Sequence, residues 1–221
     1  QTIDNMQYYV YEDDFIALAP TSRDISSVNL ASRTTEINQF AFRDCSGLTS
    51  ITLPSSLTSI GNYAFYGCSG LTGTVTIPAS VNEIGANPFR SCSNLDGIAV
   101  ESENSSYYVE GNCLIEKSTK TLIKGFNNST IPSDIKVIGD YAFATCRGFT
   151  SITLPSSLTR IGGYAFNGCT NLASVTFENT EGWQVSTSSD MSSSSSVNVT
   201  NPSTNATYLK NTYVNYYWQR G

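Results

Sequence analysis

The chain has 221 residues and a formal net charge of -6 at pH 7, with 14% charged residues and no histidine. This length is enough for one domain with a substantial core, and the negative charge argues against nucleic acid or an anionic membrane as a partner, since both need clustered Lys and Arg. The lack of histidine removes the commonest general base and metal ligand, and no apolar run approaches the ~18 residues of a membrane span.

Residues 1–36 predict an N-terminal cap followed by half of a structural repeat. The segment YYVYEDDFIALAP (8–20) is expected to form a hairpin. The segment DISSVNL (24–30) ends in Leu30, which lies seven residues before Ile37. The same offset links apolar residues later in the chain, so this segment is interpreted as a half-coil.

Residues 37–178 repeat one unit of about 23 residues. The cysteines at 45, 68 and 92 are 23 and 24 residues apart, and those at 146 and 169 are again 23 apart. A phenylalanine stands three residues before each. This core ladder consists of Phe42, Phe65, Phe89, Phe143, Phe166, Cys45, Cys68, Cys92, Cys146 and Cys169. One unit is too short to bury its own apolar face, so the units are expected to stack with the ladder inside.

Within each repeat the segment SITLP predicts a half-buried strand that ends at proline. Ile51 and Leu53 alternate with Ser50 and Thr52, which places the two apolar side chains on the inner face. The segment YAFYGC predicts a short helical or 3₁₀ turn. Glycine or asparagine follows each terminal isoleucine and stands two residues after each ladder cysteine, which predicts left-handed corners. These ten positions are Asn38, Gly61, Gly85, Gly139, Gly162, Gly47, Gly70, Asn94, Gly148 and Asn171.

The repeat is interrupted between Cys92 and Cys146, which are 54 residues apart. The extra segment, residues 107–126, predicts a β-hairpin that projects from the coil. Lys117, Lys120 and Lys124 would give this hairpin a basic edge, either to protect an exposed strand or to contact a partner.

Residues 179–221 predict a C-terminal cap, because the ends of a solenoid expose its core. The serine-rich stretch 189–197 is expected to be a loop. Asn201 followed by Pro202 predicts a helix start, with Asn as the N-cap. The aromatic segment 212–218 predicts a strand, and an exposed aromatic binding platform is the alternative.

The fold class predicted is an α/β repeat solenoid, β-rich with short helical turns, in one domain (1–221). The ladder cysteines are expected to be reduced, because stacked strands lie ~4.8 Å apart, whereas the Cβ atoms of a disulfide lie ~3.8 Å apart. Disulfides within the ladder are the competing interpretation, and the state of Cys113 stays open.

The repeat resembles the BspA-like leucine-rich repeat family. The resemblance rests on the pattern IGxYAFxGCxxLxSITLPSSLTxIG, followed approximately from Ile60, Ile138 and Ile161, and extends from about residue 24 to 220. It implies a right-handed leucine-rich-repeat superhelix and a secreted or surface-anchored protein of the kind linked to adhesion. Pro88, Asn38 and Phe149 depart from the pattern.

No constellation of residues argues for catalysis, a metal or a cofactor. The carboxylates Glu12, Asp13 and Asp14, and Glu101 and Glu103, lie beside predicted turns and strand ends. One surface is a candidate ligand-binding face, because solenoids often bind partners on extended surfaces. It comprises the outward strand residues Ser50, Thr52, Thr74, Thr76, Ser151, Thr153, Ser174 and Thr176. The alternative is that threonine is simply a good strand former.

The function predicted is a non-catalytic binding protein at the cell surface or outside the cell, a monomer that adheres to a host matrix protein or glycan. The alternative is a structural spacer that displays other modules and has no ligand of its own.

Overall fold

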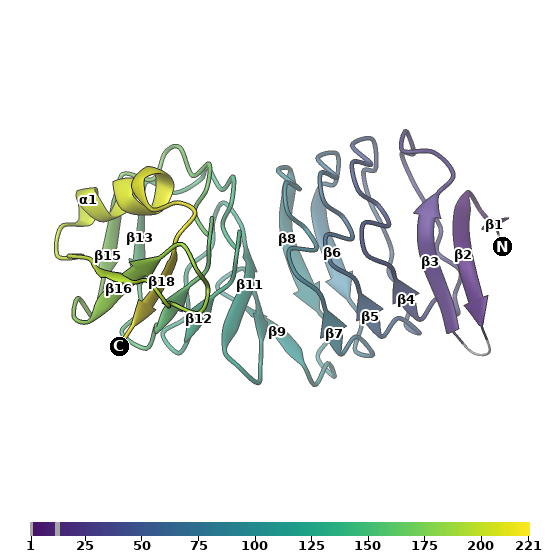
Figure 1. Cartoon of the computed structure of the whole chain (residues 1–221). Helices are drawn as coiled ribbons and strands as arrows, with labels where there is room; N and C mark the ends of the chain where they lie inside the picture. The colour runs from purple at the N-terminus through teal and green to yellow at the C-terminus, as the bar shows by residue number, and fades with distance from the viewer. Residues whose placement is uncertain (1, 12–13) are drawn as a thin grey trace. The chain divides into compact units, whose positions relative to one another are not determined.

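The computed structural model describes residues 2–11 and 14–221, and the chain forms two compact units, residues 1–109 and 110–221. Figure 1 shows the short parallel strands of successive coils within each unit. Glu12 and Asp13 of the N-terminal acidic group lie outside the described residues. Among the described residues, no helix has both the length and the apolar character needed to cross a lipid bilayer.

The described residues of unit 1 form two sheets. One has the strand order β1-β2-β3-β4-β5-β7, and the other pairs β6 with β8. The strands are β1 (Thr2–Ile3), β2 (Met6–Tyr11), β3 (Asp14–Pro20), β4 (Glu36–Ile37), β5 (Ser59–Ile60), β6 (Gly73–Ile77), β7 (Glu83–Ile84) and β8 (Leu95–Val100). Strand β9 (Tyr107–Glu110) runs across the boundary between the units.

The coils of unit 1 stack in register. Ile37 on β4 pairs with Ile60 on β5, which pairs with Ile84 on β7, all in parallel. The rings of Phe42, Phe65 and Phe89 form a parallel stack with centroid separations of 5.1 and 5.2 Å, and all three are fully buried. Because each ring packs on its counterpart from the next coil, the core runs through the stack.

Unit 2 repeats this arrangement and adds a C-terminal tail. Its larger sheet includes the order β17-β16-β18-β14-β12-β11-β10, and β13 pairs with β15 in a second sheet. The elements are β10 (Cys113–Glu116), β11 (Thr121–Gly125), β12 (Val137–Ile138), β13 (Ser151–Leu154), β14 (Arg160–Ile161), β15 (Ser174–Phe177), β16 (Trp183–Ser186), β17 (Ser195–Ser196), α1 (Pro202–Thr207), η1 (Tyr208–Thr212) and β18 (Tyr217–Arg220). Phe143 stacks on Phe166 at 5.2 Å.

The repeats contain little helix. In the described residues helical structure is confined to α1 and to the π-helical turn η1 in the tail. The helical turn expected within YAFYGC is a series of turns, in which Tyr66 N donates to Tyr63 O at 3.0 Å and Cys68 N donates to Phe65 O at 3.2 Å. The chain is therefore a β-solenoid rather than an evenly mixed α/β structure.

The hairpin at residues 107–126 does not project from the coil as predicted. Strands β10 and β11 are antiparallel, but β11 also pairs in parallel with β12 and continues the stack. Leu114 and Ile115 are fully buried. Lys124 is also buried, with its Nζ 5.6 Å from the centroid of the Phe126 ring, so it does not belong to a basic edge. In unit 1, strands β2 and β3 are arranged alike, since β3 pairs in parallel with β4.

The predicted left-handed corners are wrong, because none of the ten positions has a positive φ. The positive φ angles fall two residues later, for example at Tyr63, and directly before each ladder cysteine, as at Gly67. Glycine is needed at several of the ten positions for a different reason. A Cβ on Gly61 would lie 2.5 Å from Gln39 N, and one on Gly85 would lie 2.6 Å from Asn62 N. Adjacent coils approach too closely there for a side chain.

The C-terminal tail packs on the last repeat. Asn201 is the N-cap of α1, and its side chain accepts a hydrogen bond from Thr204 N at 3.0 Å. The strand predicted over 212–218 begins only at Tyr217, because η1 and a turn precede it. Trp183 and Trp218 are buried, with ring centroids 5.1 and 6.1 Å from that of Phe177.

Candidate functional site

The candidate Ser/Thr face is divided between the two units. In unit 1, Thr74 and Thr76 lie exposed on β6, while Ser50 and Thr52 lie exposed in the preceding coil. The partners of Thr74 and Thr76 on β8 are Gly97 and Ala99. The row of hydroxyl side chains therefore gives way to small apolar residues at β8.

In unit 2 the face has one pair of strands. Ser151 pairs with Ser174, and Thr153 pairs with Thr176, between β13 and β15. Ser174 is half-buried and the other three are exposed. These side chains are short and carry one hydroxyl each, whereas interface hot spots favour Trp, Tyr and Arg. The face thus offers hydrogen bonds over a flat surface rather than an anchoring pocket.

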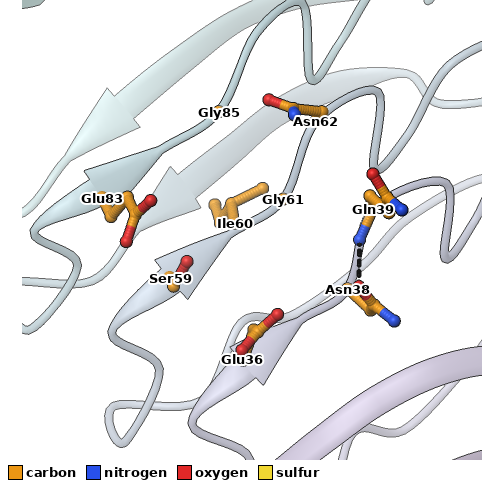
Figure 2. Close-up of a pocket in the computed structure, with 9 residues that line it drawn as sticks. All are labelled: Glu36, Asn38, Gln39, Ser59, Ile60, Gly61, Asn62, Glu83 and Gly85. Carbon is orange, nitrogen blue, oxygen red and sulfur yellow. Dashed lines mark hydrogen bonds between the residues drawn. The ribbon is translucent and has the colours of Figure 1, made fainter.

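A polar hollow of about 300 Å³ lies on another side of unit 1, at strands β4, β5 and β7. Figure 2 shows the residues that line it: Glu36, Asn38, Gln39, Ser59, Ile60, Gly61, Asn62, Glu83 and Gly85. Sequence reasoning missed this site. The available signal was that Glu36, Ser59 and Glu83 each stand directly before the inward isoleucine of a coil.

The in-register stack explains the hollow. Glu36, Ser59 and Glu83 are paired in neighbouring parallel strands, so the backbones of Glu36 and Glu83 lie about 9–10 Å apart, twice the strand spacing. Gly61 and Gly85 have no side chains that would fill the space between the coils. Asn62 Oδ1 accepts a hydrogen bond from Ala86 N at 2.6 Å, which holds the rim. The hollow can accept hydrogen bonds from hydroxyl or amino groups.

The ladder cysteines connect successive coils by hydrogen bonds. Cys68 Sγ donates to Phe42 O at 2.9 Å, Cys92 Sγ donates to Phe65 O at 3.1 Å, and Cys169 Sγ donates to Phe143 O at 3.1 Å. All six cysteines are free thiols and all are buried, including Cys113. Burial raises the pKa of Cys113 to about 11 and that of Cys169 to about 12. Protonated, buried thiols are poor nucleophiles and poor metal ligands.

Glu101 and Glu103, two of the acidic residues that the sequence singled out, make local hydrogen bonds. Glu101 Oε2 accepts from Ala79 N at 2.8 Å, and Glu103 Oε1 accepts from Ser102 Oγ at 3.2 Å. Within residues 2–11 and 14–221, no group of three or more Cys, Asp or Glu side chains is arranged to hold a metal ion. These carboxylates therefore stabilise turns.

Comparisons with known proteins identify the repeat. A profile described as BspA type leucine rich repeat region matches residues 20–124 and 115–216, in six copies. The leucine rich repeat protein TpLRR of T. pallidum is 27% identical, over 79% of this chain and 70% of that chain, with a TM-score of 0.47. The pneumococcal vaccine antigen PcpA is 18% identical, over 80% of this chain and 69% of that chain, with a TM-score of 0.54.

A leucine rich cell surface protein from Faecalibacterium prausnitzii is 20% identical, over 80% of this chain and 76% of that chain, with a TM-score of 0.42. A comparison with curated proteins found no match. The likeness to PcpA shows a shared fold. The matching profile describes a repeat family and indicates no enzyme family, and it covers most of the chain. The chain therefore belongs to the BspA-type leucine-rich repeat family.

Proposed function

We propose that this chain is a non-catalytic binding protein, located at the cell surface or outside the cell, that adheres to a protein or glycan of a host or neighbouring cell. The observation that carries the proposal is membership of the BspA-type repeat family over most of the chain. The architecture supports it. In each unit most apolar side chains and the thiols are buried in the core, while rows of polar side chains repeat at strand spacing outside.

The proposal includes the finer features of the fold. The chain is a right-handed superhelix, because crossover connections between parallel strands are right-handed in about 98% of cases. It is one monomeric domain, with residues 1–36 as the N-terminal cap and residues 179–221 as the C-terminal cap. Burial of Met6 and Tyr8 in the hairpin, and of Trp183 and Trp218 in the tail, supports capping.

The experiment that tests this function is binding of the purified chain to an array of matrix proteins and glycans. Two variants separate the surfaces. Lysine at Thr74, Thr76, Thr153 and Thr176 blocks the Ser/Thr face, and Glu36→Gln with Glu83→Gln removes the charge of the hollow. All six positions are exposed or half-buried, so both variants are expected to fold.

We expect specific binding, and loss of that binding in either variant would place the contact on the surface that the variant changes. A wild-type chain that binds nothing on the array, while retaining its folded circular dichroism spectrum, would contradict the proposal and favour the structural spacer.

A further inference from the structure

An aromatic surface on unit 1 begins directly beside the polar hollow, since Phe40 follows Gln39 and Tyr63 follows Asn62 in the chain. Phe40 stacks on Tyr63, with ring centroids 5.4 Å apart and an interplanar angle of 6°. Phe40 is 39% exposed, an uncommon state for phenylalanine in this chain. The next coil places Asn87 in the same register, and its Nδ2 lies 3.5 Å from Tyr63 Oη. All three residues have φ between 53° and 56°, and this left-handed conformation fixes where their side chains leave the backbone.

A second row runs beside the first. Arg43, Tyr66 and Arg90 occupy the same register position in three successive coils, two residues before each ladder cysteine. The guanidinium carbons of Arg43 and Arg90 lie 5.6 and 5.4 Å from the centre of the Tyr66 ring. Arg43 also lies 5.5 Å from the Phe40 ring, and Tyr66 meets Tyr63 edge to face at 6.2 Å. Together, Phe40, Arg43, Tyr63, Tyr66 and Arg90 are called the aromatic–arginine patch.

The repeat itself does not require the composition of the second row. In unit 2 the register positions of Arg43 and Tyr66 hold Ala144 and Asn167. The inner phenylalanine stack is nevertheless present there, with Phe143 on Phe166. The second row is therefore a specialisation of unit 1 and not a condition for stacking coils.

The charge of the patch stands out from its surroundings. Residues 1–109 contain eleven acidic residues, no lysine and four arginines, and two of these arginines meet at Tyr66. Arg43 pairs through Nε with Asp44 Oδ2 at 3.1 Å, and its side chain is 53% exposed. Its two terminal nitrogens are not part of that bond and can reach a carboxylate.

We propose that the aromatic–arginine patch is a docking surface for an acidic segment of a partner protein. The proposal rests on the proposed binding function and names its partner class. Guanidinium groups bind carboxylates, the exposed side of Phe40 packs on an apolar side chain, and Tyr and Arg are the residue types enriched at protein hot spots. A glycan fits less well, because stacking on a sugar needs an open ring face. One face of Phe40 packs on Tyr63, Arg43 lies over the Phe40 ring at 5.5 Å, and the two guanidinium groups approach Tyr66 from the preceding and following coils.

The test uses substitutions that the repeat already tolerates. Phe40→Asn copies Asn87, Arg43→Ala copies Ala144, and Tyr66→Asn copies Asn167, each from the same register position. Arg147→Ala is the charge-matched control, because Arg147 is exposed and lies in unit 2. The probe is a short fluorescent peptide of alternating Glu and Phe, compared with its Lys and Phe counterpart and with heparin and sialylated oligosaccharides.

We expect the full chain to bind the acidic peptide and the triple variant to bind it at least tenfold more weakly, while the triple variant stays folded at the temperature of the assay. A tenfold loss corresponds to about 1.4 kcal/mol. The Arg147→Ala control should bind like wild type, and added salt should weaken binding. Equal binding by the triple variant, no binding of the acidic peptide by the wild type, or a preference for the oligosaccharides or the basic peptide would each overturn this inference. A positive array result would still uphold the proposed function in all these cases.

Discussion

The substitution Phe65→Ala tests the claim that successive coils are held together through their inner rings. Phe65 is fully buried between Phe42 and Phe89, at 5.1 and 5.2 Å. Removing the ring forfeits about 2 kcal/mol of transfer free energy and leaves a cavity of roughly 100 Å³, which costs about 2.4 kcal/mol at 24 cal/mol per Å³. We therefore expect the free energy of unfolding to fall by about 4 kcal/mol.

A matched comparison isolates the stacking itself. Phe42 is also fully buried but begins the stack and meets one ring of it. Since an aromatic pair contributes about 0.5–1.5 kcal/mol beyond its buried area, Phe65→Ala should cost more than Phe42→Ala by about that amount.

Urea unfolding provides the measurement. Circular dichroism reports on both units, whereas the two tryptophans, Trp183 and Trp218, report on unit 2. The CD midpoint should fall for Phe65→Ala, and the two probes together show whether the loss spreads to unit 2. A loss below 1 kcal/mol for Phe65→Ala, or a larger loss for Phe42→Ala, would refute a core built by ring stacking between coils.

Three further predictions follow from local geometry. Gly61→Ala should lower the melting temperature more than Gly73→Ala. The added Cβ at Gly61 would lie 2.5 Å from backbone, whereas the Cβ at Gly73 would lie in open space and only the φ of 67° opposes it. An equal loss of melting temperature in the two variants would contradict the close approach of coils. Burial raises the pKa of the Cys169 thiol from 9.0 to about 12. The unfolded chain therefore loses that proton first, and the free energy of unfolding falls as the pH rises above about 9. Urea midpoints measured from pH 7 to 10 test this, and the thiols of the folded protein should resist alkylation at pH 8. Asn201→Ala removes the side-chain acceptor for Thr204 N and should cost about 1 kcal/mol, measured by urea unfolding, with no loss expected if the cap were unimportant.

Local patterns in the sequence were sufficient for the repeat and for its inner residues. The 23-residue spacing places Phe42 and Phe65 in equivalent positions, and a buried stack is the one way such short units bury their apolar side chains. The helix start at Asn201 could also be predicted from the sequence, because the side chain of an N-cap residue bonds to a backbone group only three residues away.

Features that depend on contacts between two neighbouring coils could not be predicted from the sequence. A glycine in the repeat can be needed either for a positive φ or for the close approach of a neighbouring coil. Only the position of Gln39 beside Gly61 shows that the second reason applies at Gly61. Lys124 is buried on β11, a strand that pairs with both β10 and β12.

The surfaces with candidate functions have the same origin. Glu36 and Glu83 lie 47 residues apart in sequence, and Arg43 and Arg90 are separated by the same interval, yet each pair lies two coils apart in the stack. The sequence by itself determined the period of the solenoid and the residues that point into it, since these depend on repeating local chemistry. The tertiary structure alone decided which outer side chains meet, because that depends on the register between neighbouring coils.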